Sequence, residues 1–196
     1  STTNIASNGF QNSYAPSFLA KFNSNGVRLW GTYYGKNTSS DYNAGRFCAT
    51  DSDNNVYLAG RTNHTSNISF QGFQNSYGGG SSDAYIVQFD PSGTRLWATY
   101  YGGEDNDGIR GMHVDAANQI YVPGTTQSTN NIFVQGFQDT LQSETGFVAK
   151  IGCPNPLLVN LATEVCANSS ISINPYPIGG TLELLGQGNL TNGIYT

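Results

Sequence analysis

The chain has 196 residues, only 11% of them charged, and its formal net charge is −5. This length allows one domain or two small ones with a real hydrophobic core. The acidic balance argues against a surface that binds nucleic acid or anionic membranes, and no stretch approaches the roughly 18 apolar residues of a membrane-spanning helix. The 12 tyrosines and 10 phenylalanines favour β-strands over disorder.

An internal repeat dominates the sequence. The string GFQ begins at Gly9, Gly72 and Gly136, in two nearly equal steps of several tens of residues. Trp30 and Trp97 occur in two similar strings, RLWGTYYG and RLWATYYG, which are separated by a similar step. Such periods are typical of architectures in which each unit is one small supersecondary element. Because the chain begins within a repeat and ends without a clear boundary, we expect it to be a piece of a longer protein.

Each repeat reads as a set of four short strands, without helical periodicity. Between residues 84 and 89, Tyr85, Val87 and Phe89 alternate with Ile86 and Gln88, which predicts that one face is buried more completely than the other. The other strands that the best-preserved repeats predict span residues 95–101, 108–114, 119–125 and 146–151.

Short polar turns join these predicted strands. Two of them, Asp90-Pro91-Ser92-Gly93 and Asn23-Ser24-Asn25-Gly26, end on a glycine that is free to adopt a positive φ. Two others, residues 51–54 and 115–118, end on asparagine, which tolerates the left-handed conformation better than other side chains. Pro123 lies late in a strand and removes a ladder donor, which predicts a sheet edge or a bulge.

The strings DAYIVQFDPSGTRLWATYYGG, GMHVDAANQIYVPGTT and GFQNSYGGGSSDAYI resemble the bacterial seven-bladed-type β-propeller repeat family (SBBP repeats). The resemblance covers about residues 9–151. It implies an all-β fold, a partial β-propeller of about two to three four-stranded blades over residues 1–152, completed by the remaining blades of the same chain. The family is a structural repeat class, so the resemblance implies no catalytic residues.

After Ile151 the repeat pattern ends. Residues 153–164 read as a linker, and residues 165–196 resemble the start of an Ig-like β-sandwich of bacterial surface proteins, here truncated. Cys153 and Cys166 are either a disulfide in an oxidising compartment or two free thiols, and both alternatives stay open. We expect Cys48, in an apolar strand, to be a buried small hydrophobe.

The acidic loop around Glu104, Asp105 and Asp107 is the strongest candidate for a metal site, because closely spaced oxygen donors suit Ca²⁺. A solvated loop without metal is the simpler alternative, and no other cofactor is expected. A similar pattern, Asp51-x-Asp53-x-Asn55, is better interpreted as a hairpin turn.

Three further residues are candidates for ligand binding. His113 lies on the strand expected nearest the propeller axis, where it either faces a central channel or is hydrogen-bonded locally. Arg46 and Arg110 are separated by the same interval as Asp41 and Asp105. These pairs predict either one structural salt bridge per blade or an arginine that faces a ligand.

Tyrosine pairs and the two tryptophans make one aromatic strand per repeat, which favours packing between blades over an exposed platform for sugars. Together these observations predict a non-catalytic interaction or adhesion module, extracellular or on the cell surface, with protein or glycan partners. The alternatives are an extracellular carbohydrate-active or other hydrolytic enzyme with its site in the propeller funnel, and a purely architectural stalk. Paired carboxylates about 5–10 Å apart that face inward would favour hydrolysis.

Overall fold

The computed structural model describes residues 5–36, 43–133, 136 and 145–152, and the short strands at 171–172, 190–191 and 194–195. The described part of the chain is all-β and contains no helix, which confirms the all-β part of the predicted fold class. The chain divides into two compact units, Ser1–Ile151 and Gly152–Thr196. Among the described residues no helix is long and apolar enough to cross a membrane.

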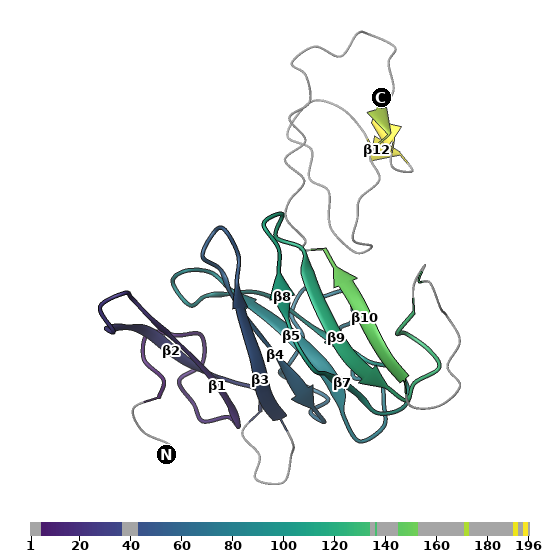
Figure 1. Ribbon diagram of the computed structural model, residues 1–196, viewed down its shortest axis with the longest axis horizontal. Coiled ribbons are helices and arrows are strands. Elements are labelled where there is room, and N and C mark those ends of the chain that lie inside the picture. Colours follow the sequence, from purple (N-terminus) through teal and green to yellow (C-terminus); the bar gives the residue numbers. More distant parts are fainter. Residues whose placement is uncertain are drawn as a thin grey trace. The chain divides into compact units, whose positions relative to one another are not determined.

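In the described part of the first unit, three antiparallel sheets follow one another in chain order (Figure 1). The first sheet pairs β1 (Ser17–Phe22) with β2 (Arg28–Tyr34). The second has the order β3 (Asn43–Thr50), β4 (Val56–Thr62), β5 (Asp83–Phe89), β6 (Arg95–Tyr101). In the third, β9 (Ile120–Thr126) pairs with β10 (Thr145–Ile151) on one side and with β7 (Asp107–Ile109) and β8 (His113–Val114) on the other.

The hairpin turns have the predicted chemistry. Gly26 and Gly93 have φ values of 75° and 91°, and Asn54 and Asn118 have 62° and 60°, so Asn occupies the left-handed position where Gly is missing. Each turn is also held by the side chain of its first residue. Asp51 Oδ1, for example, accepts hydrogen bonds from the backbone of Asp53 (3.0 Å) and Asn55 (2.8 Å). The Asp51-x-Asp53-x-Asn55 pattern is therefore a hairpin turn, as interpreted.

The segment of residues 108–114 is not one strand, as predicted, but two, and the interruption lies opposite Pro123. The register against β9 shifts between Ile109 and His113, which is a bulge. Arg110 N donates to Pro123 O (2.8 Å), and N and O of a strand residue project toward the same side. The donor that Pro123 lacks therefore faces the irregular segment. The predicted bulge is confirmed, whereas the predicted edge position is wrong, because β9 is the central strand of its sheet.

Aromatic residues at equivalent repeat positions join each pair of neighbouring sheets, stacked at the first junction and edge to face at the second. Tyr34 of the first sheet stacks on Tyr85 of the second (ring centroids 5.7 Å apart), and the hydroxyl of Tyr34 donates to Ile68 O. One repeat later, Tyr101 contacts Phe147 of the third sheet (5.4 Å) and donates to Ile132 O (2.8 Å). The aromatic strands thus pack between sheets, as predicted, and the side chains of Trp30, Trp97 and all four paired tyrosines are buried.

The side chains of β5 fill two interfaces at once. Tyr85, Val87 and Phe89 join the core cluster with Leu19 and Trp30 of the first sheet. On the opposite face Ile86 is also fully buried, and β7 of the third sheet packs against β5. The expectation that one face of this strand is buried more completely than the other is therefore wrong: every residue of β5 is buried.

The two outer sheets expose positions that the second sheet buries. By repeat equivalence, Phe22 matches Phe89 and Val148 matches Ile86. Phe22 is 57% exposed and Val148 is 75% exposed, whereas Phe89 and Ile86 are completely buried. Each outer sheet therefore has one face covered by the second sheet and one face open.

Cys48 is exposed, so the prediction of a buried cysteine is wrong. It pairs across β3 and β4 with Leu58, which is buried against the first sheet. The described first sheet has only two strands; Ser17 of β1 hydrogen-bonds to Asn43 O and Gly45 N at the start of β3, but Cys48, farther along β3, is left exposed. Cys153 and Cys166 lie outside the described residues, as does the whole of the predicted linker at residues 153–164.

In the second unit, β13 (Ile194–Tyr195) pairs antiparallel with both β11 (Ile171–Ser172) and β12 (Leu190–Thr191). These three strands are the only part of residues 153–196 that the structure describes.

The equivalent phenylalanines give a matched test of the packing. Phe89→Ala removes a side chain buried between sheets and is expected to lower the free energy of unfolding by about 3–5 kcal/mol. Phe22→Ala, at the equivalent but open position, is expected to lower it by less than about 1 kcal/mol. Chemical denaturation of both variants measures the difference; equal losses would show that the open face of the first sheet is covered in solution.

Candidate functional site

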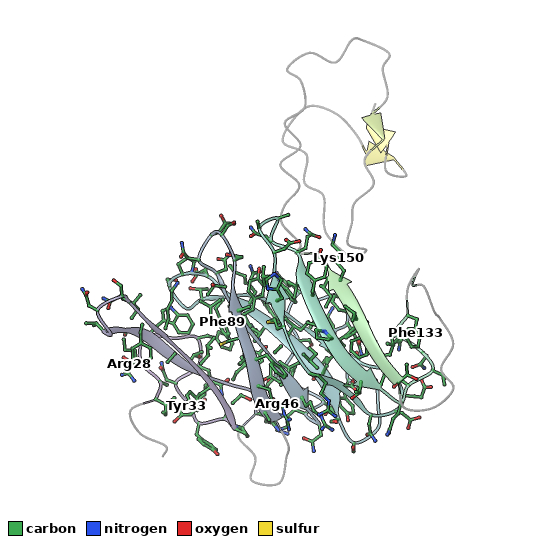
Figure 2. All side chains as sticks on the ribbon, viewed as in Figure 1. Arg28, Tyr33, Arg46, Phe89, Phe133 and Lys150 are labelled. Carbon is green, nitrogen blue, oxygen red and sulfur yellow. The ribbon has the colours of Figure 1, made fainter. Side chains whose placement is uncertain are left out.

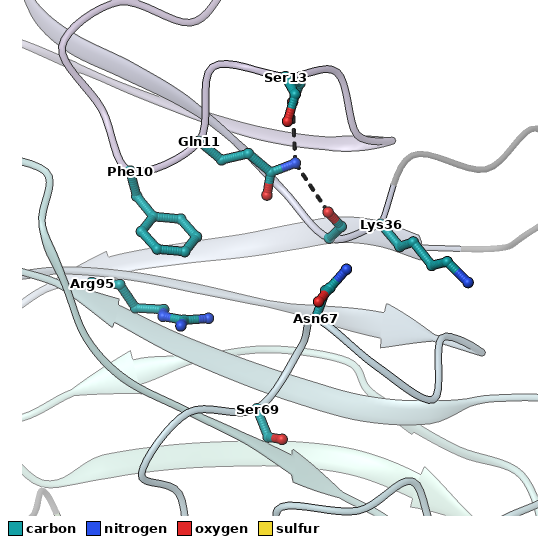
Figure 3. A pocket seen from close by; sticks show the side chains of 8 residues that line it. Phe10, Gln11, Ser13, Lys36, Asn67, Ser69 and Arg95 are labelled. Carbon is teal, nitrogen blue, oxygen red and sulfur yellow. Dashed lines mark hydrogen bonds between the residues drawn. The ribbon is translucent and has the colours of Figure 1, made fainter.

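A hollow of about 570 Å³ lies where the first sheet meets the second (Figure 3). The residues around it come from the GFQ segment before β1, the end of β2, the loop after β4 and the start of β6. They are Phe10, Gln11, Ser13, Gly35, Lys36, Asn67, Ser69 and Arg95. Two of these residues are cationic, and none of the described residues that line the hollow carries a carboxylate.

Arg95 is held in place from both sides. Its guanidinium carbon lies 4.4 Å from the ring centre of Phe10 and 4.4 Å from that of Phe70, which is the geometry of a cation–π sandwich. Burial raises the pKa of Tyr34 to about 12, and the positive charge of Arg95 opposes this rise. A guanidinium held against two rings in this way has little freedom left, which favours binding of a planar anion such as a carboxylate.

The wall that carries Gln11 is equally fixed. Gln11 N donates to Thr32 Oγ1 (2.8 Å), and Gln11 Nε2 donates to Gly35 O (3.0 Å) and Ser13 O (3.1 Å). A Cβ on Gly9 would lie 2.4 Å from Gly31 O, so only glycine lets this segment approach β2. The GFQ string, interpreted from sequence only as a repeat marker, therefore fastens one wall of the hollow.

Arg95 was not among the site residues predicted from the sequence. The residue recurs one repeat earlier as Arg28, in the other copy of the RLW string. Because the arginine recurs, the sequence indicated a residue that supports the repeat fold. The structure shows that Phe10 and Phe70 both contact Arg95. The equivalent Arg28 donates to Ile5 O (3.2 Å) and is not among the residues that line the hollow.

The three acidic candidates for calcium do not form one site. Glu104 is exposed, and its Oε1 accepts hydrogen bonds from the backbone (2.9 Å) and hydroxyl (2.5 Å) of Thr129. Asp105 is exposed too, and its backbone N donates to Ser128 Oγ (2.9 Å). Asp107 instead lies buried between the second and third sheets. Among the described residues no group of three or more His, Cys, Asp or Glu side chains could hold a metal ion.

Asp107 instead lies close to Asp83, which was not among the site residues predicted from the sequence. Both side chains are buried: Asp107 is 2% exposed and Asp83 is 0% exposed. Both carboxylates lie next to Gly102. A Cβ on Gly102 would lie 2.6 Å from Asp83 Oδ1 and 2.9 Å from Asp107 Oδ2. Both distances are measured from the same Cβ position. The separation of Asp83 Oδ1 and Asp107 Oδ2 therefore cannot exceed the sum of the two distances.

Burial raises the pKa of Asp83 to about 7, and the charge of Asp107 adds to the rise. Burial also raises the pKa of Asp107, against hydrogen bonds from Thr126, Gly103 and Ser128. The upper limit on the spacing of this pair lies at the short end of the range expected of hydrolytic carboxylates. A substrate cannot reach them in this structure, however, because both side chains are covered.

His113 lies exposed on β8, opposite Tyr121. Among the described residues its ring has no hydrogen-bond partner, so the local hydrogen bond considered from sequence is not formed. His64, in the loop after β4, is buried, and its Nδ1 accepts a hydrogen bond from Lys36 N (3.2 Å).

Arg46 and Arg110 are both exposed and lie at the bulge of their sheets. In the second sheet the register shifts between Gly45 and Phe47, so Arg46 is the inserted residue. Figure 2 labels its side chain. The recurrence of arginine here therefore reflects a repeated bulge, a feature that re-aims side chains. Asp105 and Arg110, both described, form no ion pair; Asp41 lies outside the described residues. Neither arginine lines the hollow.

Comparison with models of known protein families finds none that matches this chain, and no curated protein matches it.

The buried carboxylate pair predicts a pH dependence of stability in the presence of EDTA. Between about pH 4 and pH 7 folded Asp83 keeps a proton that the unfolded chain releases, so stability falls as the pH rises through this window. Relative to Asp83→Asn, the free energy of unfolding of the wild type is expected to fall by about 1–3 kcal/mol from pH 5 to pH 8. Urea denaturation at both pH values measures this; the same pH slope in both proteins would contradict it.

Proposed function

We propose that the chain is part of a β-propeller that serves as a non-catalytic interaction or adhesion module, extracellular or on a cell surface. Three observations support the propeller. The sheets recur at the period of the sequence repeat, a tyrosine at the equivalent position contacts the next sheet at both junctions, and the outer sheets each leave one face open. Further blades of the same SBBP type, from the rest of a longer chain, are the proposed cover for those faces.

For residues 165–196 the proposal is the start of an Ig-like domain, after a linker at residues 153–164. The antiparallel pairing of β13 with β11 and β12 supports the Ig-like proposal.

The proposed ligand is an acidic glycan that carries carboxylate groups. The observation that carries this proposal is the guanidinium of Arg95, clamped between Phe10 and Phe70 beside a hollow that also presents Lys36. Asn67, Ser69 and Ser13 add the neutral donors and acceptors that hydroxyl groups of a sugar require. Because the whole chain has a net charge of −5, the attraction is local to the hollow.

The non-catalytic character is supported by the position of the carboxylates. The close pair Asp83 and Asp107 is buried, and the described lining of the hollow offers cations and amides without an acid and base pair. The hydrolytic alternative would need an exposed pair of carboxylates. The open hollow likewise favours a binding module over a purely architectural stalk.

A glycan array with neutral, sulfated, sialylated and uronic-acid-containing sugars tests the proposal on the 196-residue chain. Carboxylated sugars are expected to bind, and Arg95→Gln is expected to weaken binding roughly 10- to 100-fold because a charge-assisted bidentate contact is lost. Lys36→Gln, at an exposed position, is expected to weaken sugar binding less than Arg95→Gln does. Added salt is expected to weaken sugar binding because it screens the charges.

Arg28→Gln is the matched control, since Arg28 is the repeat equivalent of Arg95 outside the hollow. Absence of binding to every acidic sugar, or equal losses in the Arg28 and Arg95 variants, would overturn the proposed ligand. Binding to acidic peptides alone would replace the glycan with a protein partner.

A further inference from the structure

Asp83 and Asp107, the two carboxylates between the second and third sheets, each have one oxygen with hydrogen-bond partners and one without. Asp83 Oδ2 accepts a hydrogen bond from Gly78 N (2.6 Å), and Asp107 Oδ2 accepts from Gly103 N (2.7 Å) and Ser128 Oγ (2.8 Å). The Oδ1 atom of each residue is buried and has no hydrogen-bond partner. Buried carboxylate oxygens without a partner are strongly unfavourable, so the folded protein needs something that neutralises them.

The repeat itself does not require this pair. At the junction of the first and second sheets the equivalent of Asp107 is Asn43, and the equivalent of Asp83 is Pro16. Asn43 Nδ2 donates to Tyr34 O (2.8 Å), a bond that a carboxylate cannot make. The same backbone framework therefore carries one neutral amide at the first junction, whose Oδ1 is also buried without a partner. At the second junction it carries two acidic groups.

The surroundings of the pair are rich in oxygen. A Cβ on Gly78, whose backbone N–H binds Asp83, would lie 2.4 Å from Gly103 O and 2.7 Å from Gly102 O. Carbonyl oxygens of this segment therefore lie next to the loop that holds Asp83. Carboxylates are the ligands that a hard cation prefers, and Ca²⁺ accepts irregular arrangements of six to eight oxygens, backbone carbonyls and water included.

We propose that Asp83 and Asp107 bind a Ca²⁺ ion between the second and third sheets through their unpartnered Oδ1 atoms. The ion would link the start of β5 to the start of β7 and supply the positive charge that the junction lacks. This site differs from the exposed acidic loop at Glu104 and Asp105, and it does not rest on the ligand proposed for the hollow. Because the site is closed in the folded chain, binding is coupled to folding.

Thermal unfolding of the 196-residue chain at pH 8 tests the proposal, in 5 mM CaCl₂ against 1 mM EDTA. At a Ca²⁺ concentration about 100-fold above the dissociation constant, the Tm of the wild type is expected to rise by about 5–10 °C. Asp107→Asn, which reproduces the residue of the first junction, and Asp83→Asn are expected to lose most of this shift. Glu104→Gln and Asp105→Asn, in the adjacent exposed loop, are the controls and are expected to keep it.

Terbium luminescence gives a second readout on the wild type alone, so the test does not depend on whether a variant folds. Tyr77 lies close enough for Asp83 and Asp107 to act with burial in raising its pKa to about 12, and it is positioned to sensitise Tb³⁺ bound at the pair. Sensitised emission that Ca²⁺ displaces is expected.

Three outcomes would overturn the proposal. With neither a Ca²⁺-dependent Tm shift nor Tb³⁺ emission in the wild type, the pair holds a proton alone. A shift that survives in both Asp83→Asn and Asp107→Asn places the ion elsewhere. A shift lost only in the Glu104 and Asp105 variants assigns it to the exposed loop.

Discussion

The first unit depends on strands whose two faces are both buried. In β5 the residues Tyr85, Val87 and Phe89 project toward the first sheet, while Ile86 projects to the other side, and all are fully covered. A strand of this kind has no polar face to present to water, so the second sheet is complete only with a neighbour on each side. The recurring tyrosine contacts at both junctions follow from this requirement, because the repeat places the same aromatic residue at each one.

Both candidate sites lie at junctions between sheets. The hollow at the first junction gathers Phe10, Arg95 and Asn67 from segments that are far apart in the chain. The carboxylate pair at the second junction joins Asp83 to Asp107 across two sheets. A junction held by close packing fixes such groups without help from the local sequence, which suits a binding surface that must keep its shape.

The turns and most strands were predictable because their causes are local. A glycine or an asparagine must stand where φ is positive, and side chains alternate along a strand, so Gly93 and Asn118 could be placed from the sequence. The exposure of Cys48 was not predictable, since it depends on how many strands the neighbouring sheet has. The central position of Pro123 was missed for a related reason: the missing donor is absorbed by a bulge in the adjacent strand.

The sites were harder to predict than the fold, because they depend on which copy of a repeated position meets which neighbour. Arg95 and Arg28 stand in the same sequence context, and only one lies between two phenylalanines. Asp107 was identified from the acidic loop, but its partner Asp83 reads in sequence as the ordinary start of a strand. The sequence repeat therefore predicted the strands and turns, but it did not show at which positions the environments of equivalent residues differ.

Native-state hydrogen exchange tests the packing account most directly. If the second sheet is complete and its neighbours each have an open face, amides of β4 and β5 should exchange only through global unfolding. Amides of β1, β2 and β10 should exchange faster, through partial opening of the outer sheets. Protection of β1 or β10 equal to that of β5 would contradict the account, because it would mean that the outer sheets are covered on both faces.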